Sequence, residues 1–366
     1  MYKFLLTASL WLEALAKKEI ERQWYKILEV QDKAVYFEWE IEAIARMNLW
    51  SRFGNILYYV IEQERQVKDF DSFFDILYDI SWEKYIPDGA EVNIKATSIK
   101  SELWSTSSLQ GLAKKAIVKN LVGDDFLIES PTRGTIEVRI LMENNTLRVL
   151  LNTSGDGLHK RGYREMTWEA PIKENIAAAL VILSNWRFHE PFYDLFCGSG
   201  TIAIEAAMIA KNQAPGLTRN FAFEDWKWLP FGLIKTEKEL ARSKEFSGEY
   251  TIYASDINRS VLDTAKRNAK FAGVDECIRF QCMDYKNIIH KKIRGWLVSN
   301  PPYWQRLEDF DVEEIHRDIA RELAKNEELQ GGIITSHADF EIYSKTKYKK
   351  RKLYNGWELC YFYRKM

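Results

Sequence analysis

The chain has 366 residues, with 52 lysines and arginines against 53 acidic residues and a formal net charge of −1. Hydrophobic residues make up 46% and charged residues 29%, a balance that excludes a disordered, collagenous or low-complexity chain. Four scattered cysteines argue against a disulfide framework and show no metal-ligand spacing. No apolar run reaches the roughly 18 residues that a membrane span needs. We therefore expect a cytoplasmic, metal-free protein that does not associate with membranes.

The first 155 residues intersperse strands and helices without a glycine-rich phosphate loop. Apolar residues recur at three- and four-residue spacing in some segments and alternate in others. This pattern predicts an α+β region that ends before a turn-rich, basic stretch. Helices are predicted over 12–20, 41–50, 70–84 and 107–121, and strands over 35–39, 55–62, 91–97, 135–142 and 146–152.

The second half of the chain alternates strand and helix, which predicts a mostly parallel, doubly wound α/β sheet. An Asn355-Gly356 turn predicts a hairpin near the C-terminus, so the last strand should run antiparallel. Residues 211–248 interrupt the alternation and are interpreted as an insertion. Strands are predicted over 191–195, 249–255, 278–283, 295–299 and 331–335, and helices over 175–185, 201–211 and 260–272.

Asp194 ends a predicted strand, and Gly198 and Gly200 lead into the next helix. The glycines allow a ligand to approach the backbone, and the N-terminus of the helix favours a negative group. The Asp194 carboxylate can accept hydrogen bonds from an ammonium group. A ligand with both charges is an amino acid, such as the methionine end of S-adenosylmethionine. The two-glycine spacing differs from the fingerprint of a nicotinamide dehydrogenase, which disfavours that class.

Asp256 and Asp284 end the next two predicted strands. Ligands of doubly wound sheets bind at the carboxyl ends of the strands, so the three aspartates form one constellation. Asp256 is placed to bind the two ribose hydroxyls of a nucleoside. Asp284 is placed to accept from an adenine amine, with Met283 or Tyr285 beside the ring.

Residues 300–303, Asn-Pro-Pro-Tyr, follow the fourth of these strands. The two prolines end strand pairing and fix the backbone. The Asn300 side chain and the Pro301 carbonyl can then face one point as two acceptors, which suits an exocyclic amine. Tyr303 offers a face on which a flipped base can stack.

The segments 194–207 (DLFCGSGTIAIEAA) and 300–303 (NPPY) resemble those of class I S-adenosylmethionine-dependent amino-methyltransferases. The blocks 155–164 (GDGLHKRGYR) and 170–174 (APIKE) are more specific. They resemble the THUMP-domain RNA guanine-N2 methyltransferases, above all the bacterial family that acts on 23S ribosomal RNA. The resemblance covers nearly the whole chain. It departs from the family at Leu195, where proline is frequent, and at 304–305, where Trp-Gln replaces Gly-Glu.

This resemblance implies a Rossmann-like methyltransferase domain at 176–366 with a seven-stranded sheet, joined by a linker at 156–175. It also implies a ferredoxin-like segment at 1–60 and a THUMP RNA-binding domain at 61–155. The implied catalytic residues are Asn300, Pro301, Pro302 and Tyr303. The implied S-adenosylmethionine-binding residues are Asp194, Phe196, Cys197, Gly198, Ser199, Gly200, Thr201, Asp256, Ile257, Asp284, Tyr285 and Asn300.

Basic residues concentrate in three stretches, 95–119, 158–164 and 344–366. The first two are predicted to contact RNA phosphates, whereas the third is equally well explained as a solvated face. The predicted RNA-binding residues are Lys114, Lys115, Lys119, His159, Lys160, Arg161 and Arg164.

The leading hypothesis is an enzyme that transfers a methyl group from S-adenosylmethionine to the N2 amine of a guanine in structured RNA, with 23S ribosomal RNA or a ribosome assembly intermediate as partner. Two alternatives keep the chemistry but change the target, to a guanine of tRNA or to adenine N6 in nucleic acid. A third is a non-catalytic RNA-binding assembly factor with a vestigial cofactor pocket. The intact set of aspartates, glycines and Asn-Pro-Pro-Tyr argues against such decay.

Overall fold

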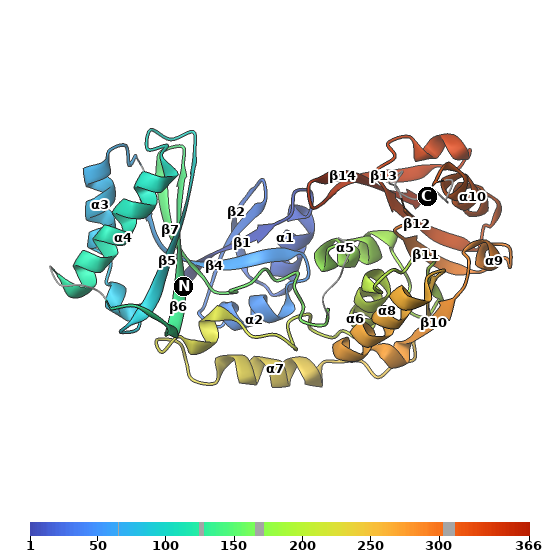
Figure 1. The fold of residues 1–366 in the computed structure, drawn as a ribbon, viewed down its shortest axis with the longest axis horizontal. Helices are drawn as coiled ribbons and strands as arrows, with labels where there is room; N and C mark the ends of the chain where they lie inside the picture. The colour runs from blue at the N-terminus through green and yellow to red at the C-terminus, as the bar shows by residue number, and fades with distance from the viewer. Residues whose placement is uncertain (65, 124–127, 165–171, 303–311) are drawn as a thin grey trace.

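The computed structural model describes residues 1–366 except 65, 124–127, 165–171 and 303–311. Its secondary structure forms two separate seven-stranded sheets, one in each half of the chain (Figure 1). Together with the helices around them, the sheets confirm the predicted combination of an N-terminal α+β region with an α/β domain.

The first sheet has the strand order β2-β3-β1-β4-β7-β6-β5. Helices α1 (Glu13–Arg22) and α2 (Ala43–Trp50) lie in the first part of this region, and α3 (Phe70–Tyr78) and α4 (Thr106–Val122) in the second. The predicted boundary at residue 60 falls within β4, which pairs with β1 on one side and β7 on the other. The proposed ferredoxin-like and THUMP segments therefore share one sheet. Its strands are β1 (Tyr2–Ala8), β2 (Lys26–Gln31), β3 (Ala34–Trp39), β4 (Gly54–Glu64), β5 (Ala90–Ile99), β6 (Ser130–Glu143) and β7 (Thr146–Asn152).

Three elements of this region differ from expectation, the first of them strand β1, whose apolar run was not predicted to be a strand. The helix predicted over 70–84 ends at Tyr78, and a short 3-10 turn follows at Trp82–Lys84. The buried Trp82 indole donates to the Leu77 carbonyl at 2.7 Å, which holds the chain in the turn. Strand β2 was not predicted because this edge strand has no buried residue and therefore no apolar alternation.

The second sheet has the strand order β10-β9-β8-β11-β12-β14-β13. The strands from β10 to β12 run parallel, and β14 runs antiparallel to both β12 and β13, as predicted. The carboxyl ends of the parallel strands consequently meet at one edge. The strands are β8 (Phe192–Asp194), β9 (Ile252–Asp256), β10 (Ile278–Cys282), β11 (Gly295–Ser299), β12 (Leu329–Thr335), β13 (Tyr348–Asn355) and β14 (Glu358–Lys365).

Helix α5 lies between the two halves of the molecule (Figure 1). Because it is covered from both sides, nine of its residues are buried, including Glu174 and Asn175. The Asn175 amide donates to Asn55 Oδ1 of the first region at 3.0 Å. The helices of the second half are α5 (Glu174–Ser184), α6 (Thr201–Ala210), α7 (Leu233–Ser243), α8 (Arg259–Ala272), α9 (Lys286–Ile289) and α10 (Val312–Lys325).

The 211–248 insertion makes side-chain contacts that hold the two halves of the molecule together. Helix α7 lies against α2, where Arg46 forms a two-point ion pair with Glu237 (Nη2 to Oε1 2.7 Å, Nε to Oε2 3.2 Å). The Trp228 ring packs on Tyr59 and Tyr85 of the first region, with centroids 5.4 and 5.5 Å apart. The insertion therefore fixes the position of the N-terminal region relative to the second sheet.

Candidate active site

The loop from β8 to α6 turns sharply at its two glycines. Gly198 and Gly200 have φ angles of +51° and +86°, which side chains disfavour. A Cβ atom on Gly200 would also lie 3.0 Å from Cβ of Ala265 on α8. Glycine at 200 thus permits both the turn and the close packing of α6 and α8.

Asp194, at the end of β8, is buried, with 1% of its surface exposed. Its Oδ1 accepts from Ser299 Oγ at 2.5 Å, whereas Oδ2 has no hydrogen-bond partner among the described residues. Burial raises the pKa of this carboxyl to about 7, although the Ser299 hydrogen bond lowers it in part. A buried carboxyl oxygen without a partner is costly, so this site is complete only when a donor binds.

Ser299 was not among the predicted site residues. Its hydroxyl also accepts from the backbone N–H groups of Leu195 and Phe196, both at 3.1 Å. One side chain therefore ties the Asp194 loop to the strand that ends in Asn300. A polar residue at the last position of an apolar strand, directly before Asn-Pro-Pro, was the available signal.

Asp256 and Asp284 follow on the adjacent strands, so the structure brings the three aspartates to one edge of the sheet. Asp256 Oδ2 accepts from Gly198 N at 3.0 Å, and its Oδ1 accepts from Asn258 N at 2.9 Å. Asp284 Oδ1 accepts from Lys286 N at 2.8 Å. Both carboxylates are partly exposed, which leaves lone pairs for a ligand.

Two rings lie beside these carboxylates. The centroids of Phe196 and Tyr285 are 5.1 Å apart, and the Tyr285 hydroxyl donates to Asp318 at 3.1 Å. This hydrogen bond holds the Tyr285 ring in place next to Asp284. Ile257 follows Asp256 directly and is 55% exposed. Its side chain can therefore cover only the solvent-facing side of a ligand bound at Asp256.

Asn300 directly follows β11, and its Oδ1 is buried without a hydrogen-bond partner among the described residues. Pro301 is buried and Pro302 is half-buried, consistent with a fixed backbone at this point. Tyr303, predicted to stack on the target base, lies outside the described residues. The described part of the motif thus presents an amide oxygen that lacks a donor.

The remaining loop residues have partners within the protein. The Thr201 hydroxyl is buried and accepts from Arg164 at 2.7 Å, so only its backbone is available to a ligand. The Ser199 carbonyl accepts from Asn268 at 3.0 Å, and its hydroxyl lies 3.5 Å from the Thr201 hydroxyl, which leaves the Ser199 N–H for a ligand. Burial raises the pKa of the Cys197 thiol far above its usual range, so Cys197 is a neutral packing residue.

Arg161 corrects a prediction, because it is 1% exposed and cannot contact RNA. Its guanidinium donates to the carbonyls of Arg52 and Leu158, both at 2.6 Å, and pairs with Glu205 of α6 at 3.3 Å. Arg161 therefore joins the N-terminal region to α6. The sequence showed that this block is basic. It did not show that Arg161 is buried, because that burial depends on Glu205, 44 residues further along the chain.

The other residues of this block are also largely engaged. The Arg164 guanidinium is half-buried and lies 3.4 Å from Glu174. Burial lowers the pKa of His159 to about 4, so it carries no charge at neutral pH. Arg219 of the insertion donates to four carbonyls between residues 154 and 160. Lys160 is exposed and pairs with Asp156 at 3.1 Å, so only Lys160 offers a charge to solvent.

The three lysines of α4 that were predicted to bind RNA also differ in whether their charges are paired within the protein or exposed to solvent. Lys114 is paired with Glu129 and also donates to the Val92 carbonyl at 2.9 Å. Lys115 and Lys119 are exposed, and Lys119 lies 6.0 Å from the Tyr78 ring centroid. The surface available for phosphate contact on this helix therefore narrows to Lys115 and Lys119.

Within the described residues, no cluster of three or more histidine, cysteine or acidic side chains is arranged to hold a metal ion. The unpartnered oxygens of Asp194 and Asn300 instead call for a ligand with N–H donors. The Asp194 end fits an ammonium group, and the adjacent Asp256 and Asp284 fit hydroxyl and amine donors. These residues fit S-adenosylmethionine, with its amino acid, ribose and adenine parts spread over three strands.

Over the described residues, no helix is long and apolar enough to cross a membrane.

Comparison with known proteins agrees with this geometry. Residues 161–360 match the family model UPF0020, described as an RMKL-like methyltransferase domain, and residues 3–55 match the RlmL ferredoxin-like domain. The chain belongs to this methyltransferase family. The identification confirms the predicted family and fold, and S-adenosylmethionine as the cofactor of the second half.

Full-length relatives share this organisation. The chain is 37% identical over 363 residues to "Putative RNA methyltransferase YpsC" of Bacillus subtilis strain 168, covering 97% of this chain and 93% of YpsC. It is 35% identical to the structure of SMU.472 complexed with SAH (TM-score 0.89, 99% and 97% of the two chains). It is 34% identical to a "predicted N6-adenine-specific DNA methylase" from Listeria monocytogenes (TM-score 0.90, 99% and 95%).

Proposed function

We propose that this methyltransferase modifies the exocyclic N2 amine of a guanine in structured RNA, with 23S ribosomal RNA as the substrate. The observation that carries the chemistry is the buried, unpartnered Asn300 Oδ1 at the carboxyl edge of the sheet. An acceptor held there suits an amine donor. A hydroxyl or carbon substrate would not supply the two N–H groups that Asn300 and the Pro301 carbonyl can accept.

The protein has a simple task in this reaction. S-adenosylmethionine, when bound, supplies a methyl group on a sulfonium that is already a good leaving group. Asp194, Asp256 and Asp284 hold the cofactor, and Asn300 with the Pro301 carbonyl orients the amine. Positioning of the two reactants supplies most of the rate acceleration, so no strong base is needed, and the proton that the methylated amine loses passes to solvent. Fixed acceptors also favour the amine as it develops positive charge.

The assignment of RNA as substrate rests on three supporting points. The relative YpsC carries the name of an RNA methyltransferase and matches nearly the whole chain. The N-terminal region is of the RlmL ferredoxin-like type over residues 3–55. Exposed lysines on α4 add a surface for phosphates. The guanine N2 target and 23S ribosomal RNA follow from the family resemblance of the 155–164 block.

Replacement of Asn300 tests the chemistry. Asn300→Ala should reduce single-turnover methyl transfer to undermethylated ribosomal RNA by about 10² or more, while cofactor affinity changes little, because Asn300 acts mainly on the reacting amine. Asn220→Ala, an exposed asparagine in the insertion, is the matched control. Near-normal transfer by Asn300→Ala would reduce the motif to a structural loop.

Adenine N6 in DNA is a second candidate, favoured by the name of the Listeria relative. Both targets are exocyclic amines, so the site alone does not separate them. Mass spectrometry of nucleosides from ribosomal RNA, tRNA and genomic DNA, with and without the gene, does so. Loss of N2-methylguanosine from ribosomal RNA supports the proposal. Its loss from tRNA changes the substrate, and loss of N6-methyladenine from DNA overturns the proposal.

A further inference from the structure

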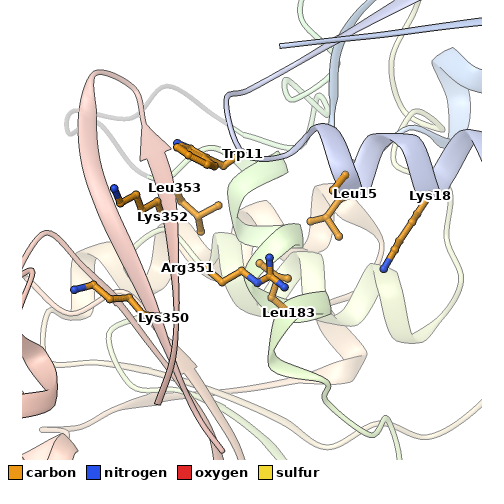
Figure 2. Close-up of a pocket in the computed structure, with 9 residues that line it drawn as sticks. Trp11, Leu15, Lys18, Leu183, Lys350, Arg351, Lys352 and Leu353 are labelled. Atoms are coloured by element: carbon orange, nitrogen blue, oxygen red, sulfur yellow. The ribbon is translucent and has the colours of Figure 1, made fainter. Parts of the chain in front are cut away.

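A cavity of about 280 Å³ separates the N-terminal region from the C-terminal hairpin (Figure 2). One wall is α1 with Trp11, two residues before it, another is β13, and the end of α5 forms the floor. It lies outside the aspartate and Asn-Pro-Pro site described above. The lining residues are Trp11, Ala14, Leu15, Lys18, Leu183, Lys350, Arg351, Lys352 and Leu353.

The lining contains four cations and no acidic residue. Lys350 donates to the Ala338 carbonyl, and its ammonium lies 4.6 Å from the Tyr361 ring centroid, on the far face of the hairpin. Arg351 points the other way, into the space between β13 and α1, and Lys18 enters that space from α1 (Figure 2). Both are exposed, and neither forms an ion pair within the described part of the chain. Two positive charges therefore face the cavity unneutralised.

Trp11 lies at the mouth of the same cavity and is 52% exposed. Among the described residues, no aromatic ring or hydrogen-bond partner covers its indole. An exposed ring next to unpaired cations is the combination that binds single-stranded nucleic acid, in which a base stacks and neighbouring phosphates are neutralised.

Strand register relates the cavity to Asn300. Ser299 on β11 pairs with Ile333, which pairs with Tyr363, which pairs with Lys350. Asn300 and Arg351 are each one residue further, so they lie at the same level with three strand spacings between them. At about 4.8 Å per spacing, the separation is about 14 Å. That distance corresponds to about four stacked nucleotides at roughly 3.4 Å each.

We propose that this cavity binds an unpaired segment of the substrate RNA, with a base stacked on Trp11 and phosphates on Arg351 and Lys18. The inference rests on the proposed function, since it requires an RNA substrate. It adds a second RNA contact, on the methyltransferase side of the molecule and separate from α4. A segment held there lies a few nucleotides from the target guanine and limits where that guanine can be.

Equilibrium binding of a short, fluorescein-labelled oligouridine to the full chain tests the cavity. Trp11→Ala should weaken binding about tenfold, the size expected for one lost base stack. Arg351→Ala should lower the slope of log affinity against log salt by about 0.7, the value for one phosphate on a single strand. Irradiation of the same RNA containing 4-thiouridine should crosslink to the peptide that contains Trp11.

Two controls match these variants. Trp24, at the other end of α1, is 86% exposed and shares a positive φ angle, but it does not line the cavity. Lys270, at the last turn of α8, is also exposed. Trp24→Ala and Lys270→Ala should bind oligouridine like the wild type.

The outcomes separate the cavity from the reaction. Wild-type binding that Trp11→Ala and Arg351→Ala leave unchanged overturns the cavity site, while methyl transfer to ribosomal RNA still stands. No oligouridine binding by the wild type, with methyl transfer intact, also overturns it. No binding together with no methyl transfer overturns both proposals.

Discussion

The 155–164 block and the carboxyl edge of the second sheet both contain buried polar groups, but the hydrogen-bonding needs of these groups are met differently. In the block, Arg161 is fully enclosed, donates to the carbonyls of Arg52 and Leu158, and pairs with Glu205 of α6. At the sheet edge, Asp194 Oδ2 and Asn300 Oδ1 are equally enclosed but have no partner among the described residues. A buried polar atom that the protein satisfies supports structure. Two unpartnered oxygens at the carboxyl edge of one parallel sheet indicate a ligand, whereas a single unpartnered atom such as Glu205 Oε2 does not by itself.

Exposed cations without an ion-pair partner form a third class of polar group, and the C-terminal hairpin of β13 and β14 contains examples. Arg351 and Lys352 are exposed and have no ion-pair partner in the described structure. Like Arg161 they carry a positive charge, but their side chains are exposed whereas that of Arg161 is buried. Positive charge in a sequence therefore predicts RNA contact only where the side chain is free, which narrows the RNA-facing candidates to Lys115, Lys119, Lys18 and Arg351. Lys160 is exposed but paired with Asp156.

Removal of Arg161 should give the largest effect on stability. Arg161→Ala leaves the buried Glu205 without its cationic partner, and it removes donors from three carbonyls, so the free energy of unfolding should fall by about 3–5 kcal/mol. Arg351→Ala should change it by less than about 0.5 kcal/mol, because an exposed cation has no buried partner. Urea denaturation of both variants measures the difference. Equal small changes would show that the block does not join the two halves.

Replacement of Asp256 should give the next largest effect, on cofactor affinity. Asp256→Ala removes an acceptor for ribose hydroxyls and the support of Gly198 N, so cofactor binding should weaken by about 2–3 kcal/mol. Asp263→Ala, on the exposed side of the neighbouring helix α8, is the control. Calorimetry with S-adenosylhomocysteine gives both values, and unchanged affinity in Asp256→Ala would remove that residue from the site.

The turn from β8 to α6 was predictable because its signals are local. A strand, an aspartate, two glycines and a helix follow one another within about a dozen residues, and parallel strands bring the later aspartates to the same edge. The role of Arg161 was not predictable, because Glu205 and the Arg52 carbonyl reach it only through tertiary packing. Ser299 is intermediate, since its position at a strand end was visible but its contacts with two loop N–H groups were not.

The pH dependence of cofactor binding gives a smaller, more specific effect. Asp194 has a pKa of about 7 in the free protein, and a ligand ammonium binds its ionised form. Binding must therefore release a proton below pH 7, so affinity for S-adenosylhomocysteine should rise up to about tenfold per pH unit toward 7 and level off above it. Asp194→Asn should bind weakly and lose this dependence. The same slope in both proteins would assign the proton to another group.

The smallest expected effect concerns α4, where one helix carries both engaged and free lysines. Lys114 forms an ion pair with Glu129, whereas Lys115 and Lys119 face solvent. If RNA lies along this helix, Lys115→Ala and Lys119→Ala should each lower the log affinity–log salt slope by about 0.7 to 0.9, and Lys114→Ala should lower it much less. The readout is anisotropy of labelled ribosomal RNA fragments over a salt series. Equal slopes for all three variants would mean that an internal ion pair does not prevent a lysine from meeting phosphate, and the distinction between engaged and free cations would fail on this surface.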